Sequence, residues 1–203
     1  MRLNPAPSHL GSLRQLPRAF FLRPSLRVAP DLLGRYLVRR VPGGRLVGRI
    51  VEVEAYRQQD PASHSYRGRT PRNEVMFRRG GYLYVYFTYG MHYCVNIVTG
   101  PEGHGEAVLI RAVEPIDGLE LFRRNRHAEG YSLTNGPAKL CQAYGFERSF
   151  NGKDLIRSDV LIAAGNKVPR RLIARSGRIG IRMAAEKQWR FFIHGNPWVS
   201  KAG

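Results

Sequence analysis

Two glutamates lie two positions apart in the segment VEVEAY, residues 51–56. If this segment is a strand, its alternation places Glu52, Glu54 and Tyr56 on one face and the smaller apolar side chains on the other. Two carboxylates on one face raise the proton affinity of at least one of them where solvent is limited, and such a carboxylate can accept a proton from water. The pair is therefore a candidate acid–base unit, although the spacing alone also allows both carboxylates to be paired with arginines.

Residues 51–98 also contain His64, a run of tyrosines and six arginines. Acidic, aromatic and cationic side chains in one segment are typical of a protein that handles a nucleobase on a phosphate backbone. Each group has an ordinary interpretation as well, since tyrosines on a strand commonly pack a sheet face and a loop histidine is commonly satisfied by hydrogen bonds. Chemistry on nucleic acid is the first hypothesis, and these alternatives stay open beside it.

The charge of the chain indicates an anionic partner. Its 203 residues include 33 lysines and arginines against 15 aspartates and glutamates, a net charge of +18. The basic residues are spread along the sequence, so the positive field belongs to the folded surface as well as to the N-terminal residues. DNA, RNA or an anionic membrane could be attracted to such a surface.

Apolar runs and cysteine spacing indicate where the protein is located and whether it binds a metal. The sequence has no run of about 18 apolar residues and no apolar N-terminal segment with a cleavage site, so we expect neither a membrane span nor export. The expected location is intracellular, and cytoplasmic or in the nucleoid if the source is bacterial. Cys94 and Cys141 each lie in an apolar pattern without zinc spacing, which predicts buried, reduced thiols and no metal site.

The elements that must position these residues predict an α+β fold, a single mixed domain with a curved, mostly antiparallel sheet and flanking helices. Residues 1–27 are rich in proline and arginine and are expected to form a basic, flexible arm before a domain over 28–203. Alternation and turn residues predict strands at 36–40, 46–55, 82–88, 93–98, 107–113, 160–163, 178–181 and 190–193. Helical patterns cover 30–33, 117–126 and 137–144.

Residues 57–81 lack periodicity and predict a long loop, and loops of this length in compact domains are usually functional. In this loop Arg69, Thr70 and Arg72 suit phosphate contacts, although the stretch could also be a solvated run of charge. Lys139 near the start of the helix at 137–144 is a second candidate for phosphate binding.

Gly90 allows a sharp turn between the strands at 82–88 and 93–98, with Tyr89 and Met91 at its tip. A large aromatic side chain at a hairpin tip is poorly placed to join a core. It is well placed to enter a base stack as a wedge.

Several motifs, taken together, closely resemble the 3-methyladenine (alkyladenine) DNA glycosylase family. The resemblance runs from about Leu32 to Ser200, and only the residues before 28 lie outside it. The motifs are Glu54-Ala55-Tyr56, Asp60-Pro61-Ala62-Ser63-His64-Ser65, Arg69-Thr70-Pro71-Arg72-Asn73, Tyr84-Val85-Tyr86 with Tyr89-Gly90-Met91, Asn135 to Gln142, Arg178-Ile179-Gly180-Ile181 and Asn196-Pro197-Trp198.

The resemblance implies a monofunctional enzyme that flips damaged purines out of double-stranded DNA and hydrolyses the N-glycosidic bond with water, without a metal, another cofactor or a Schiff-base lysine. It implies that Glu54 is the general base and that Arg111 steadies the water and the backbone beside it. It further implies that Tyr56, His64 and Tyr86 stack the flipped base, that Asn96 crowds the 2-amino group of normal guanine, and that Tyr89, with Met91 beside it, fills the vacated space. We expect a monomer.

Two other classes remain to be discriminated. A nonenzymatic nucleic-acid-binding protein would account for the charge and the tyrosines without catalysis. A metal-dependent nuclease would use Glu52, Glu54 and Asp60 as ligands and would be sensitive to chelators.

Overall fold

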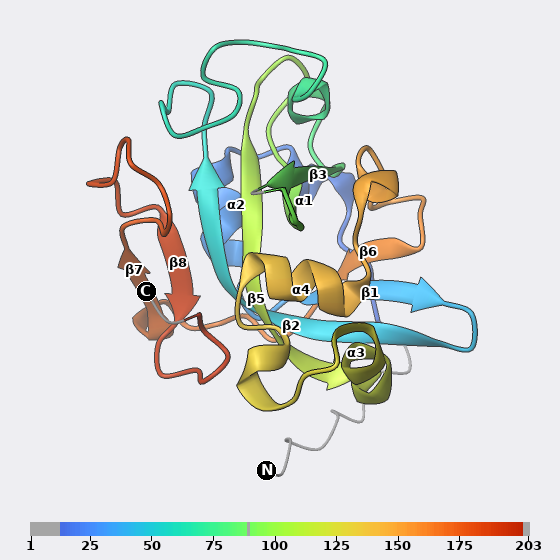
Figure 1. The fold of residues 1–203 in the computed structure, drawn as a ribbon. Helices are drawn as coiled ribbons and strands as arrows, with labels where there is room; N and C mark the ends of the chain where they lie inside the picture. The colour runs from blue at the N-terminus through green and yellow to red at the C-terminus, as the bar shows by residue number, and fades with distance from the viewer. Residues whose placement is uncertain (1–12, 89, 201–203) are drawn as a thin grey trace.

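The computed structural model describes residues 13–88 and 90–200. Eight strands form one curled sheet in which every pairing is antiparallel (Figure 1). The strand order is β3-β4-β5-β2-β1-β6, and β8 pairs with β2 and with β7. The strands are β1 (Tyr36–Val41), β2 (Gly44–Tyr56), β3 (Leu83–Thr88), β4 (His92–Val98), β5 (Ala107–Asp117), β6 (Val160–Ala163), β7 (Ile173–Ser176) and β8 (Arg190–Ile193). The predicted α+β class with a mostly antiparallel sheet is confirmed.

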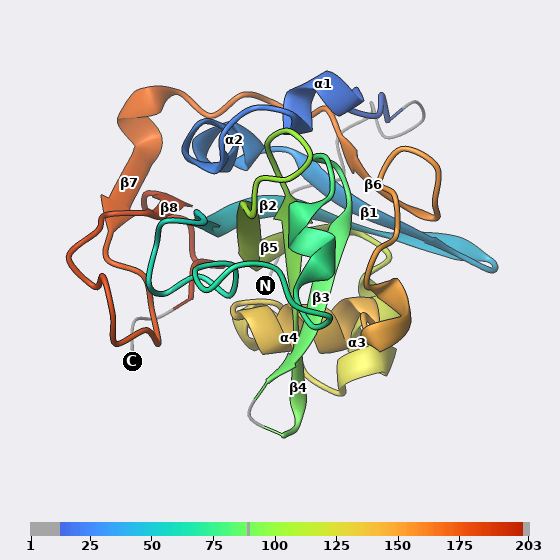
Figure 2. The ribbon, with the colours of Figure 1, turned by 90° about the horizontal axis from the view of Figure 1, so that it is seen from above.

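Helices cover both faces of this sheet. The α-helices are α1 (Arg18–Phe21), α2 (Ser25–Leu32), α3 (Leu119–Arg126) and α4 (Pro137–Tyr144), and the 3-10 helices are η2 (Glu74–Phe77), η3 (Gly130–Leu133), η4 (Arg148–Phe150) and η5 (Arg170–Leu172). Figure 2 shows α1 and α2 on one side of β2 and β5, with α3 and α4 on the other. The buried side chains of α2 recur at positions 25, 28, 29 and 32, the spacing of a single helical face packed on a sheet.

Strand β2 is the centre of the fold. Its 13 residues pair with β5 along one edge, while the other edge pairs first with β1 and then, from Glu52 to Glu54, with β8. The part of β2 that carries the two glutamates therefore has no free edge, and residues 50–55 are all buried. A carboxylate placed here must find its partners within the protein.

The N-terminal residues differ from expectation. Of the arm predicted over 1–27, the described part, residues 13–27, contains α1 and the beginning of α2, and Phe21 is fully buried in the core. The expected boundary at residue 28 is wrong for these residues, because Pro17 and Pro24 stand at the N-caps of α1 and α2. Proline is compatible with a helix start, so its presence here marks helix boundaries instead of disorder.

The C-terminal third also contains one wrong prediction. Residues 178–181 were expected to form a strand, but they belong to the loop between β7 and β8, and β7 itself lies at Ile173–Ser176. The ranges expected at 137–144, 160–163 and 190–193 are confirmed. Both cysteines are buried and free, as predicted. Among the described residues, no helix is both long and apolar enough to span a bilayer.

Candidate active site

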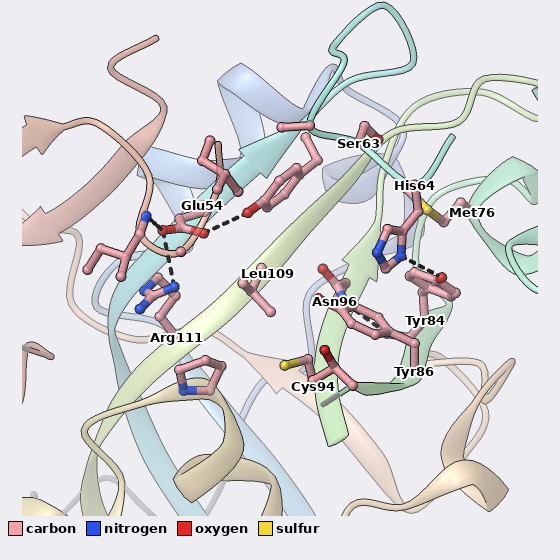
Figure 3. Close-up of a pocket in the computed structure, with 17 residues that line it drawn as sticks. Glu54, Ser63, His64, Met76, Tyr84, Tyr86, Cys94, Asn96, Leu109 and Arg111 are labelled. Atoms are coloured by element: carbon pink, nitrogen blue, oxygen red, sulfur yellow. Dashed lines mark hydrogen bonds and ion pairs between the residues drawn. The ribbon is translucent and has the colours of Figure 1, made fainter. Parts of the chain in front are cut away.

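A cavity of about 220 Å³ opens between the curled sheet, the loop that follows β2, the start of α4 and the loop between β7 and β8. The six predicted catalytic and base-binding residues all line it: Glu54, Arg111, Tyr56, His64, Tyr86 and Asn96. Figure 3 shows Glu54 and Arg111 on one side of this space, with His64, Tyr86 and Asn96 on the other. The structure thus brings together residues that lie up to 57 positions apart, counted from 54 to 111.

Glu54 is fully buried and accepts three hydrogen bonds or ionic contacts. Its Oε1 accepts a hydrogen bond from the Ile179 N–H at 2.8 Å and forms an ion pair with Nη1 of Arg111 at 3.1 Å. Its Oε2 accepts from the Tyr56 hydroxyl at 2.8 Å. A carboxylate has about four acceptor positions. The described residues donate one hydrogen bond to each oxygen, and the Arg111 cation also lies against Oε1. The arrangement suits an ionised carboxylate that can still accept a hydrogen bond from a donor such as water.

Two irregularities in the sheet position Arg111. The register of β2 against β5 pairs Glu52 with Ala112 and Val53 with Ile110, which leaves Arg111 without a partner in that ladder. A bulged residue changes direction relative to a regular strand. From this position its guanidinium reaches Oε1 of both glutamates, at 2.9 Å and 3.1 Å. Burial alone would lower the pKa of Arg111, but the Glu54 and Glu52 carboxylates outweigh it and raise the pKa.

Glu52 has a different role from Glu54. It is fully buried and does not line the cavity. Its carboxylate accepts from Nε of Arg111 at 2.9 Å, from Nε of Arg190 at 2.6 Å, and from the backbone N–H and hydroxyl of Ser200 at 2.7 and 2.8 Å. Of the two interpretations that the spacing left open, arginine pairing describes Glu52, whereas Glu54 combines an arginine contact with access to the cavity.

The opposite wall is aromatic. The rings of Tyr84 and Tyr86 from β3 lie 5.4 Å apart, and the ring of His64 lies 4.5 Å from that of Tyr86. Nδ1 of His64 is 2.9 Å from the Tyr84 hydroxyl. Burial raises the pKa of Tyr86 and raises that of Tyr84 to about 12, so both are neutral phenols. His64 is exposed at the mouth of the cavity, but partial desolvation of its ring and then the nearby Arg72 charge lower its pKa, which favours the neutral imidazole.

Asn96 lies on β4 directly opposite Tyr84, and Cys94 lies opposite Tyr86. Side chains opposite one another in an antiparallel ladder share a face, so all four point to the same side of the sheet. Asn96 is buried and donates from Nδ2 to the Tyr84 carbonyl at 3.1 Å. This bond fixes the amide at the cavity wall.

The cavity has further lining residues to which the sequence analysis gave no role. They include Met76, Tyr84, Cys94, Leu109, Pro137 and Ile179. Alternation along the strands could have identified two of them, because Tyr84 precedes Tyr86 by two residues and Cys94 precedes Asn96. No sequence pattern places Met76 or Ile179 there, since Met76 lies in the short 3-10 helix η2 and Ile179 in the loop between β7 and β8.

The predicted DNA-contacting residues that the structure describes are exposed or half-buried, and none of them lines the cavity. Arg69, Thr70 and Arg72 are exposed, and Met91 is 68% exposed in the turn between β3 and β4. Lys139 is half-buried, with its Nζ 2.8 Å from Oδ1 of Asn135. Tyr89 lies outside the described residues. The roles of these side chains on DNA remain predictions.

The arrangement does not favour the metal-dependent nuclease. Of its three expected ligands, Glu52 and Asp60 are fully buried against arginines, and Glu54 contacts Arg111. An arginine beside each carboxylate already supplies the positive charge that a cation would bring. Within residues 13–88 and 90–200, no group of three or more His, Cys, Asp or Glu side chains could hold a metal ion.

Comparison with known proteins agrees with this geometry. The family model described as methylpurine-DNA glycosylase (MPG) matches residues 19–197. A protein of Carboxydothermus hydrogenoformans, named "Putative 3-methyladenine DNA glycosylase", is 50% identical over 188 residues, which cover 92% of this chain and 98% of that protein. Proteins of the same name from Burkholderia lata and Chlorobium phaeobacteroides are 48% and 47% identical, covering 98% and 92% of this chain and 96% and 97% of their own lengths. A match of this extent, with the predicted residues gathered around one cavity, shows that the chain belongs to the methylpurine-DNA glycosylase family.

Proposed function

We propose that this protein is a monofunctional DNA glycosylase that receives an alkylated or deaminated purine, rotated out of duplex DNA, and hydrolyses its N-glycosidic bond. The observation that carries this proposal is the position of Glu54. Its carboxylate is fully buried, lies at an aromatic cavity of about 220 Å³ and keeps an acceptor position beyond its three described partners. A base extruded from the stack needs such a ring-lined space.

In the proposed reaction a water molecule donates a hydrogen bond to Oε2 of Glu54. The water oxygen forms a bond to C1′ of the deoxyribose as the bond from C1′ to the purine nitrogen breaks. The electron pair of the broken bond leaves with the purine, and the proton of the water passes to Glu54. Because positive charge develops on the sugar, the ionised carboxylate also stabilises the transition state electrostatically.

The opposite wall suits a cationic purine. Tyr84 and Tyr86 are neutral phenols with electron-rich faces, and the lowered pKa of His64 keeps its imidazole neutral. Stacking of a base on aromatic rings contributes about 1–3 kcal/mol per base. An alkylated purine also leaves its sugar more readily than a normal purine, so selection rests partly on reactivity.

Asn96 is our proposed discriminator against normal guanine. Its buried amide, held by the Tyr84 carbonyl, stands where a 2-amino group would need room or a hydrogen-bond acceptor. 3-Methyladenine, 7-methylguanine, hypoxanthine and ethenoadenine are the candidate substrates. Of these four, only 7-methylguanine carries a 2-amino group, so it is the candidate that Asn96 would disfavour most.

Outside the cavity we propose a DNA surface in which Arg69, Thr70, Arg72 and Lys139 contact phosphates. Met91, at the exposed turn beside Tyr89, would enter the base stack with it. The net charge of +18 favours this surface through release of counterions from DNA.

We further propose that base release occurs without strand cleavage. A lyase step through a Schiff base needs an amine at the reacting carbon. None of the described residues that line the cavity is a lysine. The expected product is therefore an intact strand with an abasic site.

The test is to incubate the protein with duplexes that each carry one candidate lesion, in the presence of a chelator, and to measure the released base and strand integrity before alkali. We expect release of at least one alkylated purine from an intact strand. Glu54→Gln should bind the same duplex and lower release by at least about 100-fold, the scale of a lost general base. Glu120→Gln, which changes a carboxylate that is 83% exposed, is the matched control.

The same experiment discriminates the alternative, a nonenzymatic nucleic-acid-binding protein. That class would bind all the duplexes and release no base. Release by Glu54→Gln at the wild-type rate would instead remove Glu54 from the mechanism.

A further inference from the structure

Asp60 and Arg178 form a fully buried ion pair next to the cavity, and the reaction proposed above does not use either of them. The two terminal nitrogens of the Arg178 guanidinium each contact one oxygen of Asp60, Nη2 at 3.0 Å from Oδ1 and Nη1 against Oδ2. The pair joins the loop that follows β2 to the loop between β7 and β8, 118 positions away along the chain. We call this pair the Asp60–Arg178 clasp.

Arg178 also contacts the backbone and the ring that flank Glu54. Its Nη1 donates to the carbonyl of Ala55 at 3.1 Å, and its guanidinium carbon lies 4.6 Å from the centre of the Tyr56 ring. Ala55 stands between Glu54 and Tyr56 in the chain. The Arg178 side chain therefore holds the backbone between the proposed general base, Glu54, and its hydrogen-bond donor, Tyr56.

The residue after Arg178 completes the connection. The backbone N–H of Ile179 donates to Oε1 of Glu54 at 2.8 Å. The loop that carries it has no regular secondary structure, so a contact elsewhere must fix the direction of this N–H. The clasp is that contact, because it anchors the adjacent residue to Asp60 and Ala55 at once.

Stability alone gives a weak reason for such a pair. A buried ion pair often contributes no more than apolar side chains of similar volume, because both charges lose their hydration. Nε of Arg178 has no hydrogen-bond partner among the described residues, which adds to that cost. The contacts are better explained by what they hold in place, namely the two groups that donate hydrogen bonds to Glu54.

We propose that Asp60 and Arg178 are positioning residues for catalysis: the clasp directs the Ile179 N–H and the Tyr56 hydroxyl at Glu54 and so sets the orientation of the carboxylate toward water. The inference rests on the proposed function of Glu54. It assigns Asp60 a role through Arg178 and Ile179, with no contact to substrate or to the reacting atoms.

The experiment measures single-turnover base release by Asp60→Asn and Arg178→Lys over the acidic and neutral pH range, with lesion binding measured separately in the Glu54→Gln background. We expect release to fall roughly 10- to 100-fold, the scale of a hydrogen bond to a charged group, while binding changes by less than about 3-fold. Because the carboxylate loses donors to its ionised form, the acid limb of the rate profile should move to higher pH. A role in stability alone would not move that limb.

Asp154→Asn is the matched control. Asp154 forms a similar pair with Arg18, at 2.6 Å and with side chains 17% and 18% exposed, but neither residue lines the cavity. This variant should lower the melting temperature without changing the pH profile. Arg178→Lys keeps a positive charge beside Asp60 and so avoids an unpaired buried carboxylate. It therefore tests the positioning role of the clasp if Asp60→Asn does not fold.

Wild-type release and an unchanged pH profile in folded Asp60→Asn or Arg178→Lys would overturn the clasp. So would a loss of release matched by an equal loss of binding. The two proposals fail separately: full activity in Glu54→Gln contradicts the proposed reaction, whereas inactivity of Glu54→Gln beside full activity of Asp60→Asn contradicts the clasp alone.

Discussion

The hydroxyl of Tyr56 donates a 2.8 Å hydrogen bond to the carboxylate of Glu54, two residues earlier on the same strand face. Neighbours at this spacing on a strand point the same way, but a direct bond between them requires that both side chains turn toward one another. Burial and the Glu54 charge both raise the pKa of Tyr56, so the phenol keeps its proton and remains a donor. Among the described residues this is the one contact of Oε2, whereas Oε1 faces both the Ile179 N–H and Arg111, so Oε2 is the oxygen that we expect to accept from water.

Tyr56→Phe removes this donor and keeps the ring. We expect base release to slow by about 10-fold, the lower end for a hydrogen bond to a charged group, with little change in lesion binding. Single-turnover kinetics and binding in the Glu54→Gln background separate the two effects. Tyr84→Phe is the control, because that hydroxyl contacts His64 instead of Glu54; an equal loss in both variants would contradict a specific role for the Tyr56 hydroxyl.

Glu52→Ala should mainly destabilise the fold. It leaves Arg111 and Arg190, both buried, without the carboxylate that they share, and breaking a buried pair costs about 3–5 kcal/mol. For a domain of this size that loss lowers the melting temperature by about 6–20 °C. Calorimetry checks the value against Asp31→Ala, whose pair with Arg23 is 39% exposed on both sides and should contribute less than about 1 kcal/mol. Equal shifts in the two variants would show that burial of Glu52 is irrelevant.

Protonation of His64 in acid should weaken the binding of cationic purines. Partial desolvation and Arg72 lower the pKa of His64, so the imidazole gains its proton only below the ordinary value of about 6.5, and the resulting cation repels a positively charged base. The lowered pKa also reduces the free energy of unfolding as the pH falls below about 6.5, since the unfolded chain then binds the proton more readily. Lesion affinity of Glu54→Gln across this range should fall less steeply when His64→Gln is added. Parallel curves would exclude His64 as the titrating group.

Arg72 should contribute to DNA affinity through phosphate. If it neutralises one phosphate, Arg72→Ala lowers the slope of log affinity against log salt concentration by about 0.9, whatever the base in the cavity. Titration of undamaged duplex at several salt concentrations measures this slope. Arg124, exposed on α3, is the control position, and its replacement by alanine should leave the slope unchanged. An unchanged slope in Arg72→Ala would remove that residue from the DNA surface.

Alternation along the strands predicted much of this site. It placed Glu54 and Tyr56 on one face, and both line the cavity. The same period separates Tyr84 and Tyr86, which line the cavity, from Leu83 and Val85, which lie in the core. These predictions succeeded because a strand has one simple period that local sequence reveals.

Other features depend on contacts between distant parts of the chain. The different roles of Glu52 and Glu54 depend on Arg190 and on the bulge at Arg111. Nothing in the sequence of residues 51–56 predicts either feature. The loop between β7 and β8 was predicted as a strand because residues 178–181 alternate, yet Arg178 is buried by its ion pair with Asp60. Tertiary pairing overrides local pattern at such positions.

The donors from Ser200 to Glu52 have a consequence for how the protein is made. They lie 148 positions downstream of the carboxylate, a distance that takes roughly 7 to 30 s to translate. Until residue 200 has left the ribosome, a nascent chain cannot bury the carboxylate of Glu52 with its full set of partners. The strand β2, which carries the proposed general base Glu54, is thus synthesised early but gains its last hydrogen bonds late. A chain that lacks these donors should therefore have a less stable β2 and release no purine.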